Sequence, residues 1–311
     1  MTEQAAASAP AARPTARSSG DWLRAAIRRS ESLRGYILLS PTLIVMVCGM
    51  ILPLLTMVVM SFWTQTGFDF DRSPTLANYE RAVDGAVYRA LMVRSLIISG
   101  TCAAATVLIA YPMAYYVAFH VHRRKLLWII LMTLPFWTSY LLRVFAWKII
   151  LGYNGAINSG LMSVGLIGEP LEFLLYSPTA VVITLAHAWA AFAILPIYVS
   201  LEKIDRSLLE AAADLGDGPV VRFFRVTLPL SLPGVIAAML LIFIPTVGDY
   251  VTPDLVGGPD GMMMANLIQA HFGKVNNWPM GAALAIAMML VVTVAALAYI
   301  WVSRKAVGRI A

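Results

Sequence analysis

Six long runs of apolar residues constrain this chain more than any other feature of its sequence. A helix of about 20 mostly apolar residues crosses a bilayer core about 30 Å thick, and each run is long enough for one crossing. A mean hydropathy of +0.76 and a charged content of only 13% also favour a membrane environment. We therefore predict an all-α membrane protein with six transmembrane helices. The expected spans are Tyr36 to Trp63, Met92 to Phe119, Leu126 to Leu151, Pro178 to Leu201, Leu228 to Gly248 and Met280 to Val302.

The basic residues gather at alternate borders of these spans. Of the 23 Lys and Arg, 16 lie on one side, at the termini and after the second and fourth spans, and seven lie on the other. Because positive residues near a span tend to remain in the cytoplasm, both termini are expected to be cytoplasmic. The basic excess thus belongs to membrane borders, so the bilayer and not nucleic acid is the expected partner.

Prolines punctuate the first five expected spans. Each proline removes a backbone donor and bends or interrupts its helix, which suits a path for solute between bent helices. Membrane helices also tolerate proline without any such role, and the sequence leaves both interpretations open. The positions are Pro53, Pro112, Pro135, Pro196 and Pro245.

The segment between the fourth and fifth spans has the pattern of a helical hairpin. Its first half carries apolar residues at helical spacing, and Gly216 with Gly218-Pro219 then predicts a stop and a turn. Val220 to Val226 predicts a second short amphipathic helix that leads into the fifth span. The apolar residues of the first half are Ile204, Leu208, Leu209, Ala212 and Leu215.

The same segment carries a motif at fixed spacing. Glu210-Ala-Ala, three residues, Gly216, nine residues, Val226, one residue and Leu228-Pro229 resembles the EAA motif of ABC importer permeases, with Val226 where isoleucine is usual. The resemblance implies a type I ABC importer permease fold whose coupling helix docks in a cleft of a nucleotide-binding subunit. It assigns that coupling role to Glu210, Ala211, Ala212, Gly216, Leu228 and Pro229.

Four segments follow from the spans and the resemblance. Residues 1–35 have no cleavable signal and are expected to form a disordered cytoplasmic tail, with a short interfacial helix from Asp21 to Leu33 as an option. Residues 36–91 hold the first transmembrane helix and a periplasmic loop. Residues 92–303 form the five-helix permease core, including the cytoplasmic coupling loop 202–229, and residues 304–311 form a cytoplasmic tail.

The chain contains no Gly-rich phosphate cradle ending in Gly-Lys-Ser/Thr, so it is not expected to bind nucleotide or to be an enzyme. No cofactor or metal is expected in this chain, and ATP–Mg is assigned to a partner ATPase. The resemblance implies two ATP-binding subunits, a second and homologous permease subunit, and a periplasmic solute-binding protein at a bacterial inner membrane. A secondary transporter is the alternative class, although the spans lack acidic residues at their centres.

Three further stretches resemble the spermidine/putrescine class of these permeases. They are Leu134 to Arg143, Leu195 to Asp205 and Phe243 to Asp260. The resemblance implies a polyamine as substrate, and another small organic solute is the alternative.

A polyamine needs carboxylates, carbonyls or aromatic faces along its path. The candidate path residues are Asp249, Tyr250, Trp137, Tyr140 and His187. Each also has a purely structural interpretation, as a helix cap or ion pair for Asp249, as packing for the aromatic residues, and as a hydrogen-bonded packing histidine for His187. Arg143 and Lys148 place positive charge near the same mouth, where they are expected to pair with acidic residues or to hold a binding protein.

The outer loop from Val251 to Pro279 is long for a simple connection. Its Gly257-Gly-Pro sequence predicts a turn, and Met262 to Phe272 predicts a short amphipathic helix. The resemblance makes this loop a candidate docking surface for the binding protein.

Overall fold

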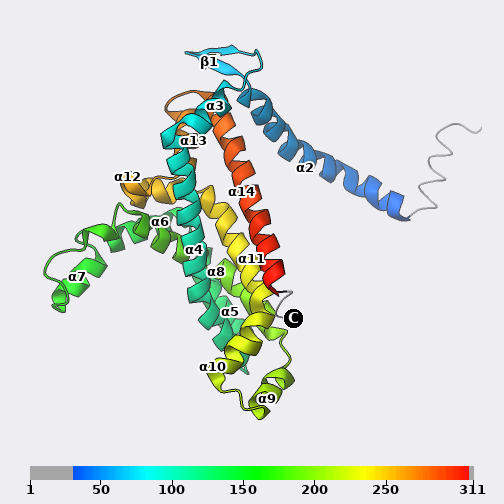
Figure 1. The fold of residues 1–311 in the computed structure, drawn as a ribbon, viewed down its shortest axis with the longest axis vertical. Coiled ribbons are helices and arrows are strands. Elements are labelled where there is room, and N and C mark those ends of the chain that lie inside the picture. Colours follow the sequence, from blue (N-terminus) through cyan, green and yellow to red (C-terminus); the bar gives the residue numbers. More distant parts are fainter. Residues whose placement is uncertain (1–30, 308–311) are drawn as a thin grey trace, which may run out of the picture. The chain divides into compact units, whose positions relative to one another are not determined.

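The computed structural model describes residues 31–307, so the predicted tails lie largely outside the described residues, over residues 1–30 and 308–311. The chain divides into two compact units, Met1–Thr56 and Met57–Ala311, and helix α2 runs from the first into the second. All other described helices and strands belong to the second unit (Figure 1). The elements are α2 (Glu31–Ser61), β1 (Thr64–Thr66), β2 (Asp69–Asp71), α3 (Ala77–Asp84), α4 (Ala86–Phe119), α5 (Lys125–Thr133), η1 (Leu134–Trp137), α6 (Tyr140–Leu151), α7 (Ala156–Ser163), η2 (Glu172–Leu174), α8 (Pro178–Glu202), α9 (Arg206–Asp214), α10 (Pro219–Arg222), η3 (Phe223–Thr227), α11 (Leu228–Val247), η4 (Pro253–Gly257), α12 (Gly258–Gly261), α13 (Met264–Gly273) and α14 (Trp278–Val307).

Five continuous helical stretches within the described residues are long and apolar enough to cross a membrane. They are Leu38–Ser61, Ala86–Phe119, Pro178–Glu202, Pro219–Val247 and Trp278–Lys305. The segment of the third expected span is a helix pair, Lys125–Trp137 and Tyr140–Ser163, bent by 83°. Six spans are therefore reached if the bent pair counts as one crossing.

The third expected span, Leu126 to Leu151, is interrupted at its proline, which is one of the two effects that the sequence predicts for proline. Pro135 lies in the 3₁₀ turn η1, where its ring and missing N–H prevent the α-helical pattern from continuing. The other four prolines singled out in the sequence lie inside continuous helices. One proline in five thus interrupts its span.

The all-α prediction also missed a small antiparallel hairpin. β1 and β2 pair Thr64 with Asp71 and Thr66 with Asp69, and Gly67 turns the chain with a φ of 65°. Strands of three residues are too short to give a readable alternation in sequence. The Gln65 side chain ties the hairpin to the start of α14 by donating to the Asn276 carbonyl and accepting from the Trp278 N–H.

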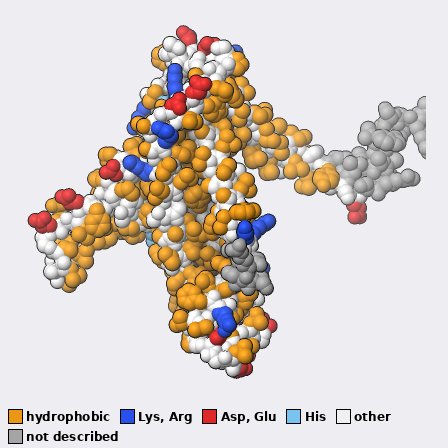
Figure 2. Space-filling model, viewed as in Figure 1, with side chains coloured by type: hydrophobic (Ala, Val, Ile, Leu, Met, Phe, Trp, Pro, Cys, Tyr) orange, Lys and Arg blue, Asp and Glu red, His pale blue; other side chains and the backbone are white. Residues whose placement is uncertain are grey.

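The centre of the bundle consists of α4, α8 and α11. Helix α8 packs most extensively on α4 and then on α11. Small residues such as Ala103, Ala110, Ala193 and Ala238 are fully buried there, and they allow the helix backbones to approach closely. Figure 2 shows hydrophobic side chains over the visible flank of the bundle, with acidic side chains near its two ends.

A second cluster joins the end of α11 to α13 and α14. Val247, Met264 and Leu284 are buried at its centre. Helix α13 confirms the predicted short helix in the loop after the fifth span, and the turn at Gly258, with a φ of 59°, confirms the predicted Gly-Pro turn.

Gly234 marks the closest approach of α11 to α8. A Cβ atom at this position would lie 2.4 Å from the Pro196 carbonyl oxygen and 2.5 Å from the Ser200 Oγ. We expect Gly234→Val to force the helices apart and to lower the free energy of unfolding by about 1–3 kcal/mol. The check is the melting temperature of the purified protein in detergent.

Gly100→Ala is the matched control, because it adds a methyl group to α4 where nothing lies within 4 Å of the new Cβ. It should leave the melting temperature unchanged or slightly higher, since alanine favours helix over glycine by about 1 kcal/mol. Equal melting temperatures for Gly234→Val and the parent chain would contradict the close approach.

Candidate functional site

The loop between α8 and α11 folds as the helical hairpin that its sequence predicts. Asp205 caps α9 by accepting a hydrogen bond from the Ser207 N–H at 3.0 Å, and this bond holds the pKa of the Asp205 carboxyl below its usual value. Helix α9 then turns into α10, which continues through the π-helical turn η3 into α11. The hairpin is thus joined to the fifth span without a flexible break.

Gly216 ends α9 in the manner its position predicts. Its φ is 90°, its N–H bonds to the Ala213 carbonyl at 2.9 Å, and the Asp217 N–H bonds to the Ala212 carbonyl at 3.0 Å. This is the Schellman pattern, in which a left-handed residue satisfies the last helix carbonyls. The Asp217 carboxylate also accepts from Arg225 at 3.1 Å, so the turn is held against the second half of the hairpin.

The two faces of α9 differ. Ala212 is buried beneath the hairpin, whereas Glu210, Ala211 and Gly216 are exposed and Leu215 is 86% exposed. Leu208 is exposed as well, so the predicted apolar stripe is only partly covered within the chain. A small, acidic and apolar surface of this kind is suited to a groove on another protein.

A cleft of about 250 Å³ opens between this hairpin and the end of α4. Glu210, Arg206 and Arg222 line it on the hairpin side, and Tyr115 and Phe119 line it on the α4 side. Leu228 and Pro229 are half-buried in the first turn of α11. The structure therefore places Glu210, Ala211, Ala212 and Gly216 on α9 and the turn that ends it, and Leu228 and Pro229 at the start of α11.

A second group of candidate residues meets at the other end of α11. The cavity there has a volume of about 470 Å³ and is called the Asp249 cavity below. Its lining comes from η1 and the following turn, α6, α8 and the end of α11. The lining residues are Phe136, Thr138, Tyr140, Arg143, Ala188, Trp189, Pro245 and Asp249.

The Asp249 carboxylate is half-buried and fixed by neutral donors. Its Oδ1 accepts from the backbone N–H groups of Val251 at 2.9 Å and Thr252 at 3.4 Å, so the expected capping role is real. Its Oδ2 accepts from the Tyr140 hydroxyl. Among the described residues no Lys, Arg or His forms an ion pair with Asp249. The site is therefore a carboxylate without a cation.

Arg143 lies in the same cavity but has other partners. Its Nη1 donates to the Ala188 carbonyl at 3.1 Å, and its Nη2 donates to the carbonyls of Pro135, Phe136 and Thr138 at 2.9–3.1 Å. The side chain is 8% exposed. The expected pairing of Arg143 with an acidic residue is thus wrong, because the break at η1 frees carbonyl groups that the guanidinium satisfies.

Lys148, the other cation near this mouth, lies over the Tyr176 ring at 5.8 Å. Within residues 31–307 it forms no ion pair with an acidic residue. Neither cation therefore neutralises Asp249.

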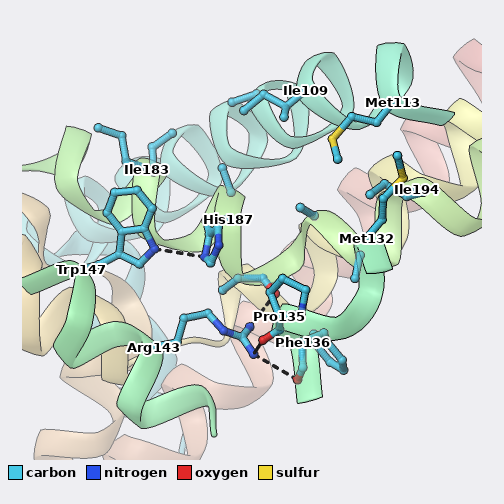
Figure 3. Close-up of a pocket in the computed structure, with 16 residues that line it drawn as sticks. Ile109, Met113, Met132, Pro135, Phe136, Arg143, Trp147, Ile183, His187 and Ile194 are labelled. Atoms are coloured by element: carbon cyan, nitrogen blue, oxygen red, sulfur yellow. Dashed lines mark hydrogen bonds between the residues drawn. The ribbon is translucent and has the colours of Figure 1, made fainter. Parts of the chain in front are cut away.

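His187 lines a different cavity of about 450 Å³, called the His187 cavity below (Figure 3). Trp147 Nε1 donates to His187 Nδ1 at 3.1 Å, so the neutral ring carries its proton on Nε2. The walls are mainly Ala, Ile and Met side chains of α4, α5 and α8, and none of the lining residues is acidic. His187 is hydrogen-bonded, as its structural interpretation predicts, and it also lines a cavity, but this cavity has no acidic residue for a cation.

Two candidate residues, Trp137 and Tyr250, do not line the Asp249 cavity. Trp137 is 80% exposed and lines neither cavity. Tyr250 faces a third space between α11, α13 and α14, because the turn after α11 sends consecutive side chains in different directions. Sequence reasoning missed Thr252, whose Oγ1 is within hydrogen-bond distance of the Tyr140 hydroxyl, since an isolated threonine carries no distinguishing pattern.

A bundle of apolar spans that carries a helical hairpin at one end and a polar cavity within it defines a membrane permease. The chain matches the family of binding-protein-dependent transport system inner membrane components over residues 15–307. Because the match covers most of the chain, this protein belongs to that family, whose members are multi-pass inner-membrane permeases and not enzymes. The prediction of an importer permease is confirmed, and the secondary-transporter alternative is not supported.

Named relatives refine the comparison. The chain is 35% identical over 254 residues to the spermidine/putrescine transport system permease protein PotB of Escherichia coli, covering 81% of this chain and 92% of that protein. It is 37% identical over 251 residues to PotB of Haemophilus influenzae, covering 80% and 87%. The inner membrane ABC transporter permease protein YdcU of Escherichia coli is 32% identical over 254 residues, covering 77% and 80%.

Solved structures share the fold at low sequence identity. A crystal structure of a bacterial ABC transporter that imports alginate matches with a TM-score of 0.66 at 17% identity, covering 91% of this chain and 99% of that chain. A structure of a bacterial alginate transporter in complex with its alginate-bound periplasmic protein matches with a TM-score of 0.70, covering 92% and 98%. The fold is therefore that of an ABC importer permease.

Removal of the Arg143 side chain should damage the bend between η1 and α6. Arg143→Leu leaves several buried carbonyl groups without donors, so we expect the free energy of unfolding to fall by about 2 kcal/mol or more. Arg143→Lys, with a point charge and no planar fork, should give an intermediate loss. Melting temperatures in detergent provide the measurement.

Lys148→Leu is the control on the same helix, since its contact with the Tyr176 ring is worth at most about 1 kcal/mol. If Arg143→Leu were no less stable than Lys148→Leu, the guanidinium would not be what holds the bend.

Proposed function

We propose that this chain is the permease subunit of an ATP-driven polyamine importer, and that Asp249 binds a substrate ammonium group. The observation that carries the proposal is the Asp249 carboxylate, which is half-buried, faces a cavity and has no cationic partner among the described residues. The similarity to the two PotB permeases supports the polyamine class.

The chemistry of the Asp249 cavity fits a polyamine. Such a molecule is a chain of methylene groups that carries ammonium groups at intervals. The carboxylate can pair with one ammonium, while Phe136, Trp189 and Tyr140 offer aromatic surface to a cation or to the methylene groups beside it. Arg143 does not compensate the carboxylate, because its Nη1 and Nη2 atoms donate to carbonyl groups and it forms no ion pair with Asp249. An incoming cation therefore meets an unpaired negative charge.

The second part of the proposal concerns coupling. We propose that α9 faces the cytoplasm and docks on an ATP-binding subunit through the face that carries Glu210, Ala211 and Gly216. The excess of Lys and Arg on that side of the spans and the spacing of the Glu210 to Pro229 motif support this orientation, which makes both termini cytoplasmic. ATP–Mg then acts on the partner, whose movement reaches Asp249 through the continuous path of α10, η3 and α11.

The complete transporter would contain two ATP-binding subunits and a second permease homologous to this chain. A periplasmic solute-binding protein would deliver the substrate to the opposite face, where the loop from Val251 to Pro279 lies. In this arrangement the Asp249 cavity is one wall of a path shared with the second permease.

The test is substrate-dependent ATP hydrolysis and uptake by the complete complex reconstituted in lipid vesicles. Spermidine and putrescine should stimulate both activities in the presence of the binding protein. A neutral sugar and an acidic amino acid serve as unrelated solutes and should stimulate neither. Stimulation by the unrelated solutes alone would overturn the polyamine assignment while leaving the permease assignment in place.

A further inference from the structure

The hydroxyl of Tyr140, which lines the Asp249 cavity, lies within hydrogen-bond distance of two oxygen atoms. It donates to the Asp249 carboxylate, and its oxygen is 2.5 Å from the Oγ1 of Thr252. Tyr140 belongs to the first turn of α6, whereas the two acceptors flank the turn that follows α11. This contact therefore joins the second half of the bent span to the end of the helix that starts at the coupling hairpin.

A phenol has one hydrogen and can serve only one acceptor at a time. While it serves Asp249, the Thr252 hydroxyl can donate to the Tyr140 oxygen. If another group takes the carboxylate, the Tyr140 hydrogen can rotate to Thr252 and remain satisfied. Thr252 is fully buried and its Oγ1 is 2.5 Å from the Tyr140 oxygen. When the Tyr140 hydroxyl loses Asp249 as its acceptor, it can therefore donate to Thr252 and avoid the cost of an unpaired donor. In the first state the Tyr140 hydrogen points to Asp249, and in the second it points to Thr252.

We propose that the Tyr140 hydroxyl occupies Asp249 as a placeholder in the empty transporter, and that a substrate ammonium displaces it onto Thr252. This inference rests on the proposed binding of an ammonium group by Asp249. The exchange is favourable because an ammonium adds the attraction of opposite charges to the hydrogen bond that the neutral phenol makes. No covalent bond changes, and no proton leaves either partner.

The exchange has a mechanical consequence. In the empty state, the Tyr140–Asp249 hydrogen bond ties α6 to the end of α11. Substrate binding releases that tie, and α11 is continuous through η3 with the hairpin that carries Glu210. Substrate binding in the cavity therefore changes the contacts at the end of α11, the helix that connects to the hairpin on which the ATPase would dock. This connection favours ATP hydrolysis only when substrate is bound.

The proposal predicts opposite effects for two conservative substitutions. Tyr140→Phe removes the placeholder, so the apparent KM for spermidine should fall by about threefold to tenfold, within the worth of one hydrogen bond to a charged group. ATP hydrolysis without substrate should rise, because the tie between α6 and α11 is gone. Thr252→Val removes the second acceptor while keeping the side-chain shape, so Tyr140 stays on Asp249 and the KM should rise by about threefold or more.

The double variant separates the placeholder from simple packing effects. Tyr140→Phe with Thr252→Val should behave like Tyr140→Phe alone, because Thr252 acts only through the Tyr140 hydroxyl. Thr252→Ser keeps the acceptor and should restore the wild-type KM. Tyr153→Phe, which removes an exposed phenol hydroxyl outside the cavity, is the matched control and should change neither quantity.

All variants are measured in the complete complex with its binding protein, by spermidine uptake and by ATP hydrolysis with and without spermidine. A higher KM in Tyr140→Phe would make Tyr140 a direct substrate ligand and would overturn the placeholder. An unchanged KM in Thr252→Val, or independent effects in the double variant, would overturn it as well. If the unmodified complex does not respond to polyamines, the proposed function fails. The role of the Tyr140–Asp249 hydrogen bond is then tested by ATP hydrolysis without substrate, which should still be higher in Tyr140→Phe than in the parent complex.

Discussion

Glu210→Lys should abolish coupled transport while leaving the permease folded and inserted in the membrane. Glu210 is exposed on α9 and lines the cleft beside the hairpin, so its side chain is available to a docked subunit. Reversal of its charge places like charges against any basic partner surface, at a cost of several kcal/mol. We therefore expect spermidine uptake and substrate-stimulated ATP hydrolysis to fall by about 100-fold or more.

The measurement compares co-purification of the ATP-binding subunit, uptake and hydrolysis for Glu210→Lys, Glu210→Gln and the parent chain. Glu210→Gln keeps the shape without the charge and should give a smaller loss. Glu80→Lys reverses an exposed charge on α3, far along the chain from α9, and should retain the ATP-binding subunit. Normal uptake by Glu210→Lys would show that α9 is not the coupling element.

The helical hairpin between α8 and α11 could be predicted because its determinants are local. A glycine is favoured at position 216 because the backbone there adopts a φ of 90°. Asp205 caps α9 by accepting a hydrogen bond from the N–H of Ser207, two residues later. These requirements involve neighbours in sequence, so one sequence shows them. The six spans were predictable for a similar reason, since the length of an apolar run is fixed by the thickness of the bilayer.

The Asp249 cavity was only partly predictable because its residues come from three separate segments. Asp249 and Tyr140 were singled out individually, but their hydrogen bond spans 109 residues and depends on the 83° bend of the third span. The sequence indicated a proline at that bend without giving its angle. Acidic partners or a binding protein were the two roles that the sequence suggested for Arg143, because the carbonyl groups that it binds become free only once the helix is broken.

Adjacent residues can also belong to different sites. Asp249 and Tyr250 were grouped as path candidates, yet they face different cavities because α11 ends at Val247 and the chain turns. Thr252 was overlooked although it lies in the stretch Phe243 to Asp260, because its contact with Tyr140 joins residues 112 positions apart. The sequence does not specify how the backbone turns after α11, and that turn determines where the side chains of both Tyr250 and Thr252 lie.

Asp249→Asn should nearly abolish polyamine import. The substitution keeps the size of the side chain, and an amide oxygen can still accept the backbone bonds that cap the turn after α11. It removes the negative charge that the cavity leaves unpaired, and a hydrogen bond to a charged group is worth about 1.5–3 kcal/mol before the charge attraction is added. We therefore expect the apparent KM for spermidine to rise by about 100-fold, with uptake at low concentration close to background.

Asp254→Asn is the matched control, because Asp254 is an exposed carboxylate five residues further along the chain and does not line the cavity. It should import spermidine with the parent KM, whereas Asp249→Asn should retain the parent melting temperature and its association with the ATP-binding subunit. A rise in KM without loss of assembly assigns the defect to substrate binding. If Asp249→Asn kept the parent KM, an ammonium group would not pair with this carboxylate, and the cavity would serve only to hold α6 against α11.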